Sequence, residues 1–145
     1  MKNSQRITKI HLSVNDQDIP AIFGIVSQDP DYKLSLKLNK ELGISLKNSD
    51  PVAVSDEEGK EFLFSKFSDS SSAQGSVFQL VSNRSEGEFL LKKLKNIDYV
   101  LLIHDPGKNY NLEQVLLLVR EIESITGVFN IEFKALKDRN LKYLA

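Results

Sequence analysis

Cysteine is absent from the 145-residue sequence, which also lacks tryptophan and contains only two histidines. Without thiols the chain can form no disulfide, zinc–thiolate site, iron–sulfur cluster or cysteine nucleophile. The two histidines, His11 and His104, stand far apart in the sequence, which argues against a shared site. We therefore expect neither a bound metal nor a cofactor.

A strong net charge and long apolar runs are missing as well. Nineteen basic residues against twenty acidic ones leave a net charge of -1, too near neutral to bind nucleic acid or an anionic membrane by overall charge. No apolar run exceeds five residues, against the roughly 18 that a transmembrane helix needs. The first residues also lack the apolar stretch of a signal peptide. We expect a cytosolic protein that binds neither nucleic acid nor membrane.

The composition is that of one globular domain. Hydrophobic residues make up 41% of the chain and charged residues 27%, which is enough apolar surface for a core. Charge is spread evenly, and no linker divides the sequence. We predict a single domain over residues 1–145 with an ordered core at about 7–136.

Hydrophobic periodicity predicts six strands and two helices. The strands are expected at residues 10–14, 19–26, 62–67, 77–82, 97–103 and 129–135. Residues 19–26 and 97–103 are apolar on both faces, so both strands should lie inside the sheet, and a turn at 16–18 should join the first two strands as a hairpin. The polar stretches 48–60 and 68–76 are predicted loops.

The first helix is predicted after Asp29 and Pro30, a cap and first-turn pair, and should end at Gly43. The second helix is predicted over residues 112–125, with Gly127 beyond its end. The order β-β-α-β-β-β-α-β indicates an α+β fold: a two-layer sandwich with a mainly antiparallel sheet, both helices on one face, of ferredoxin-like type.

Two polar clusters are candidate ligand-binding sites. Asn83, Arg84 and Glu86 follow the strand at 77–82 and could bind an anion, with Asp98 and Tyr99 at the start of the next buried strand. The alternative is a turn with an Arg–Glu contact at the surface.

The second cluster is His104, Asp105 and Gly107, extended by Asn109. Here a carboxylate could orient an imidazole while a glycine lets backbone donors approach a ligand. Turn and helix-entry chemistry already explains Asp105 and Pro106, and a lone histidine beside them is more often a surface residue, so the structural interpretation is favoured. No nucleophile–base pair accompanies either cluster, so the sequence nominates no catalytic residue.

Leu117 points away from the apolar face of the second helix. It is a candidate contact for a homodimer formed through helix or strand edges, although single exposed leucines are normal.

Residues 91–99, LKKLKNIDY, resemble the short motif of the bacterial IPExxxVDY family. Asp98 and Tyr99 match that motif, whereas Lys92 and Lys93 replace its Pro and Glu. Residues 82–85, SNRS, are similar to the Ser-Asn-Lys-Ser stretch of the family, and the order of elements over residues 7–135 is also similar. The family is uncharacterised, so the resemblance implies no reaction and no catalytic residue.

Residues 103–133 are similar to one half of an ACT-type regulatory domain. The resemblance implies a ferredoxin-like fold and an amino-acid ligand near a strand–helix turn, often at a dimer interface. The glycine of this turn is offset from the usual Asp-x-Pro-Gly of such domains.

Three functions are therefore compared. The first is a non-enzymatic protein-interaction module, which could form a homodimer. The second is an ACT-like domain that senses an amino acid or another small molecule. The third is an enzyme with a polar site at Asn83, Arg84, Glu86 and Asp98.

Overall fold

The computed structural model describes residues 19–132 together with Asn140 and Leu144. Its strands are β2 (Ala21–Ser27), β3 (Lys47–Ser55), β4 (Glu61–Asp69), β5 (Val77–Ser82), β6 (Arg84–Ser85), β7 (Glu88–Phe89), β8 (Tyr99–His104) and β9 (Ile125–Ile131). Its helices are α1 (Asp31–Leu42) and α2 (Leu112–Arg120). The strand predicted at 10–14 and the end of the last predicted strand lie outside the described residues.

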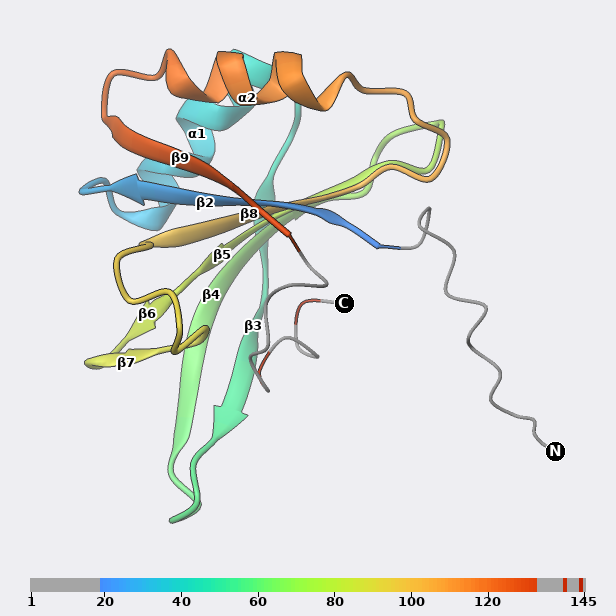
Figure 1. The fold of residues 1–145 in the computed structure, drawn as a ribbon. Helices are drawn as coiled ribbons and strands as arrows, with labels where there is room; N and C mark the ends of the chain where they lie inside the picture. The colour runs from blue at the N-terminus through green and yellow to red at the C-terminus, as the bar shows by residue number, and fades with distance from the viewer. Residues whose placement is uncertain (1–18, 133–139, 141–143, 145) are drawn as a thin grey trace, which may run out of the picture.

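Six of these strands form one sheet in the order β3-β4-β5-β8-β2-β9, and every neighbouring pair is antiparallel. Figure 1 shows this sheet with both helices packed over one face. The small hairpin of β6 and β7 lies beside β4. The α+β class, the antiparallel sheet and the shared helical face are confirmed. The internal positions of β2 and β8 are confirmed as well.

Alternation along the central strands divides the core into two parts. On β8, Leu101 and Ile103 belong to the cluster that contains the buried residues of α1 and α2. Val100 and Leu102 belong to the cluster on the opposite face, which the chain after β7 covers with Leu90 and Leu91. Because both faces of β8 are covered, its sequence has no polar side, which is the pattern that predicted a central strand.

The ends of the helices are only partly as predicted. Gly43 caps α1 in the left-handed conformation, φ 67°, as expected. Asp29 does not cap it, because the N-cap is Pro30 and no side chain bonds there. The second helix ends at Arg120, and Ile125 already begins β9, where its side chain reaches the core as part of a strand.

The prediction of a loop over residues 48–60 is wrong for its first part, which is β3. Val52 and Val54 alternate with exposed residues and pair with β4, but the flanking polar residues conceal this short period in the sequence. The register shifts between Ser49 and Val52, around Pro51, which is the usual place for a proline in an edge strand. The hairpin of β6 and β7 was also not predicted.

The ferredoxin-like order is not confirmed. The described chain contains one unit of that kind, since β8 and β9 are joined by α2 and lie on either side of β2. Beyond this unit the sheet continues through β5, β4 and β3. Both edges of β2 are paired, with β8 and β9, which leaves no edge of β2 for the predicted hairpin partner.

We predict that Gly24→Val destabilises the fold by about 1–3 kcal/mol through overpacking. A Cβ on Gly24 would lie 2.9 Å from the Cδ1 atoms of Ile97 and Ile131, and valine adds two methyl groups to that conflict. Urea denaturation measures the change. Ala53→Val on the exposed side of β3 is the control, and equal stability of the two variants would contradict the packing described here.

Candidate functional site

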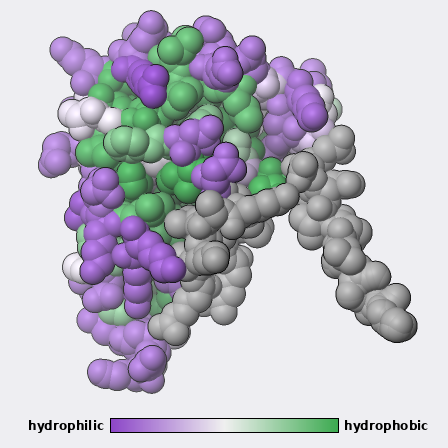
Figure 2. Space-filling model, in the orientation of Figure 1, coloured by the Kyte–Doolittle hydropathy of each residue, from purple (hydrophilic) through white to green (hydrophobic). Residues whose placement is uncertain are grey.

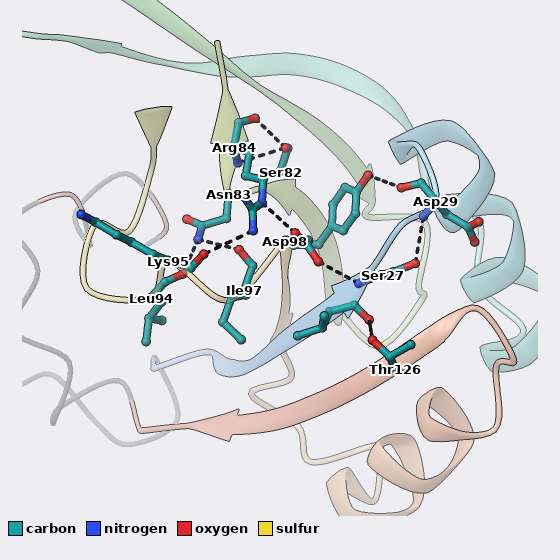
Figure 3. A network of polar contacts seen from close by, with 12 residues as sticks. Ser27, Asp29, Ser82, Asn83, Arg84, Leu94, Lys95, Ile97, Asp98 and Thr126 are labelled. Atoms are coloured by element: carbon teal, nitrogen blue, oxygen red, sulfur yellow. Dashed lines mark hydrogen bonds and ion pairs between the residues drawn. The ribbon is translucent and has the colours of Figure 1, made fainter. Parts of the chain in front are cut away.

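Four of the predicted site residues meet at one end of the sheet. Ser82 of β5 and Ile25 of β2 both pair with Tyr99 of β8, so the end of β5, the start of β8 and the end of β2 are adjacent. Figure 3 shows Asn83, Arg84 and Asp98 in one polar network at this place. The network also includes Ser27 and Asp29, which the sequence did not indicate as site residues.

Asn83 is completely buried, and every group of its side chain has a backbone partner. Its Nδ2 donates to the carbonyls of Leu94 and Ile97 at 2.9 and 3.0 Å, and its Oδ1 accepts from the amide of Leu91 at 2.7 Å. Its own amide donates to the carbonyl of Asp98, and its carbonyl accepts from Leu90. This residue therefore fixes the connection from β5 to β8 and offers no group to a ligand.

Asp98 joins that connection to β2. One carboxylate oxygen accepts from Nε of Arg84 at 2.7 Å, and the other accepts from the amide of Ser27 at 3.0 Å. Arg84 also lies over the ring of Phe89, with its Cζ 4.8 Å from the ring centroid, and donates to the carbonyl of Lys95. Both oxygens of Asp98, and one face and two nitrogens of the guanidinium, are thus engaged within the protein.

A second group of contacts connects β8 to the start of α1. The hydroxyl of Tyr99 donates to the carbonyl of Asp29 at 2.6 Å, and its burial, together with nearby carboxylates, raises the pKa of Tyr99 to about 12. Nζ of Lys37 lies 2.7 Å from the Asp29 carboxylate and also donates to Ser124. The hydrogen bond from Lys37 lowers the pKa of Asp29 below its usual value.

The polar network borders a hollow of about 380 Å³, lined by Ser27, Gln28, Asp29, Ser82, Arg84, Asp98 and Tyr99. It contains serine hydroxyls and carboxylates but no histidine. The hydroxyls of Ser27 and Ser82 donate to backbone carbonyls, so neither donates to a carboxylate that could act as its base. Since the carboxylates already accept bonds from the protein, the arrangement closes the end of the sheet and holds β2, β5 and β8 together.

Glu86 is not part of this network. It lies in the turn between β6 and β7 with φ 49°, a left-handed conformation, and borders a shallow hollow with Arg84 and Phe89. Among the described residues, no hydrogen bond or ion pair joins Glu86 to Arg84 or Asp98. The predicted Arg–Glu contact is therefore replaced by an Arg84–Asp98 ion pair.

The second predicted cluster lies at the other end of β8. The carboxylate of Asp105 accepts from the hydroxyl of Ser76 at 2.8 Å, from the amide of Tyr110 at 2.8 Å and from Nδ2 of Asn109. These bonds tie the turn after β8 to the start of β5. His104 is a residue of β8 opposite Val77, and no hydrogen bond joins these two described neighbours, His104 and Asp105.

A cavity of about 790 Å³ lies beside this turn, at the start of α2. Asp105, Lys108 and Leu112 line it together with Ile131 at the end of β9, whereas His104 and Gly107 do not. The two predicted clusters do not share a cavity, since the residues lining this one and the residues lining the network hollow are different. His104 lies five residue positions along β8 from Tyr99, which corresponds to roughly 17 Å.

The two edges of the sheet differ in chemistry. The β3 edge carries Lys47, Asp50 and Pro51 and a shift of register, which are features that block pairing with another strand. The β9 edge, ITGVFNI, contains no charged residue and no proline. Among residues 19–132, β9 pairs with β2 on one side and with no strand on the other.

A large apolar side chain stands on this open edge. Phe129 is 49% exposed, and Figure 2 shows hydrophobic side chains gathered over the face that carries β9. Leu117 is 53% exposed, which confirms that it points away from the core, and Tyr32 and Leu36 are exposed on α1. The sequence contained the signal for this edge, the neutral stretch at residues 125–131, but not its position at the margin of the sheet.

Among the described residues, no group of three or more histidine, aspartate or glutamate side chains could hold a metal ion. None of the described helices is long and apolar enough to cross a membrane. No protein-family model, curated protein or solved structure matched the chain. The geometry of the site and of the sheet edges therefore carries the functional argument.

We predict that Asn83→Ala lowers the free energy of unfolding by about 3 kcal/mol, because it leaves buried backbone groups of Leu91, Leu94 and Ile97 without partners. Chemical denaturation gives this value. Ser85→Ala serves as the neighbouring control and should change stability by less than about 0.5 kcal/mol. A loss below 1 kcal/mol for Asn83→Ala would show that the amide is free for another role.

The carboxyl group of Asp105 should make the stability of the fold depend on pH. Burial opposes ionisation of this carboxyl, but the hydrogen bonds from Tyr110, Asn109 and Ser76 outweigh it and lower its pKa. A lowered folded-state pKa stabilises the fold above the ordinary value near 3.8, and this contribution is lost as the pH falls through the folded-state pKa. The Asp105→Asn variant should have a lower free energy of unfolding than the unmodified protein at pH 7. Its free energy of unfolding should also change less between pH 5 and pH 2.

Urea denaturation at each pH tests this prediction, with the exposed Asp50→Asn as control. Parallel curves for Asp105→Asn and the unmodified protein would contradict it. Asp29 and Asp69 also have lowered pKa values, so part of the acid sensitivity should remain in the variant.

Proposed function

We propose that the protein is a non-enzymatic interaction module that binds a strand of a protein chain along the β9 edge. The single observation that carries the proposal is the contrast between the two edges of the sheet. Charges, a proline and a register shift protect β3, whereas β9 is neutral and carries a half-exposed phenylalanine. Strand addition takes its affinity from backbone hydrogen bonds and its specificity from alternate side chains.

The alternative of an enzyme at the polar network has less support. Asn83 has no group left for a substrate, and both oxygens of Asp98 accept bonds from the protein. Asp98 and Tyr99, the two residues that match the IPExxxVDY motif, both make structural contacts here: Asp98 accepts from Ser27 of β2, and Tyr99 donates to the carbonyl of Asp29 before α1. If the chain is a member of that family, as we propose, the motif would serve the fold in its relatives too.

A second candidate function is the binding of a small molecule in the 790 Å³ cavity beside α2. The cavity combines the cation Lys108 and the apolar side chains of Leu112 and Ile131 with three carboxylates, those of Asp105, Glu113 and Glu132. Charges of both signs beside apolar surface suit the ammonium and carboxylate groups of an amino acid. This is the part of the chain that resembles an ACT-type domain. A thermal-shift screen with amino acids should then give stabilisation that Lys108→Ala removes, and no shift with any of them would contradict this second function.

Photo-crosslinking tests strand binding at β9. A photoreactive residue at the exposed Thr126 should give covalent adducts in cells, and one at the exposed Ala53 of β3 should not. The adducts at Thr126 should disappear when Asn130→Pro removes an edge amide, because the edge then loses a donor.

Two results would contradict strand binding at β9. Equal yields at Thr126 and Ala53, or adducts that persist in the Asn130→Pro variant, would mean that the β9 edge does not bind a strand. Circular dichroism of each variant confirms that the sheet is intact before the yields are compared.

A further inference from the structure

The direction of the backbone groups on β9 follows from the pairing of its neighbour. The carbonyl of Ile25 accepts from the amide of Asp98 at 2.9 Å, so Ile25 turns its backbone groups towards β8. Backbone groups alternate along a strand, and Gly24 therefore turns its groups towards β9, where it pairs with Phe129. Consequently Val128 and Asn130 direct their N–H and C=O groups outward, away from β2.

We propose that the strand bound at this edge is β9 of a second copy of the chain, paired antiparallel about a two-fold axis at Phe129. This inference rests on the proposed function and names its partner. The two sheets would join into one continuous sheet with all helices on the same face. Val128 of each copy would exchange both backbone hydrogen bonds with Asn130 of the other.

Self-pairing about a two-fold axis places a strand against its own sequence in reverse, so a charged residue near the axis would face its own like charge. Residues 125–131 contain no charged side chain, so this repulsion does not arise on β9. On β3 an axis at Lys47 or Asp50 would place like charges opposite each other, and Pro51 lacks the backbone amide that pairing along the edge needs. The charge pattern therefore suits a second copy at β9.

Phe129 supplies the apolar contact of the pairing. At the axis it would face Phe129 of the second copy as a non-hydrogen-bonded pair, in which opposite Cα atoms lie about 4.5 Å apart. Gly127 leaves room for this ring, since a Cβ there would lie 3.2 Å from Cε2 of Phe129. The two half-exposed rings would then cover each other, which removes apolar surface from water on both copies.

Complementary charges at the axis test the proposal. The unmodified protein should be a dimer by light scattering at micromolar concentrations. Phe129→Lys and Phe129→Glu should each raise the dissociation constant at least about tenfold, because each places two like charges opposite one another. An equimolar mixture of these two variants should recover the mass of a dimer, because Lys then faces Glu.

Two controls exclude other surfaces. Leu63 on β4 is 50% exposed, close to the 49% of Phe129, so Leu63→Lys matches the substitution in exposure and charge but should leave the dimer intact. Leu117→Lys tests the helical face and should also leave it intact. A dimer that is lost in Leu117→Lys and retained in Phe129→Lys would overturn pairing through β9.

Distances provide a second measurement that does not depend on a destabilised variant. The chain has no cysteine, so single Thr126→Cys and Ala53→Cys variants can be spin-labelled at one site. Pairing at Phe129 predicts about 20 Å between labels at Thr126 and about 50 Å between labels at Ala53 on the outer edges. A short distance at Ala53, or none at Thr126, would overturn the proposal.

Failure of this inference can be told apart from failure of the proposed function. If the protein is a monomer at every concentration, a second copy is excluded. The photo-crosslinks at Thr126 then decide the function: adducts with another protein retain strand binding, whereas their absence, or links only within the same chain, ends it.

Discussion

The buried side-chain amide of Asn83 is the contact on which this end of the structure depends. Its three bonds to Leu91, Leu94 and Ile97 hold a connection that carries little regular structure, and this connection in turn places Leu90 and Leu91 in the core. Without these bonds, several backbone groups would be buried without partners, at a cost comparable to a large part of the stability of a small domain. Asp98 extends the same constraint to β2, so that three strands end in one network.

This network explains why polar residues cluster where no catalytic arrangement is found. The residues that look most like a binding site satisfy the backbone at strand ends, where the ladder of the sheet stops and donors and acceptors are left over. The surface that we propose for binding lies elsewhere, on an edge strand that carries the half-exposed Phe129 and whose backbone is open among the described residues. An edge of this kind is a hazard in a sheet protein unless a partner covers it.

Sequence reasoning was reliable where one physical pattern dominated. The two-sided apolar character of β2 and β8 predicted their central positions, and Gly43 predicted the end of α1, because burial on both faces and a left-handed cap each require particular residues. It failed for β3, whose apolar residues are few and interrupted by Pro51. It also failed at the end of α2, since Ile122 and Ile125 fit a helical face as well as they fit a turn followed by a strand.

For the site, the sequence by itself selected a polar group and excluded thiol chemistry. The group comprised Asn83, Arg84, Glu86, Asp98 and Tyr99, of which Glu86 lies outside the network. Tertiary structure decided their roles, because only the pairing of β5 with β8 shows that the groups of Asn83 point at backbone atoms. It also decided which strand is an edge. Strand order depends on contacts between residues distant in the chain, as between β2 and β9, and local periodicity does not encode it.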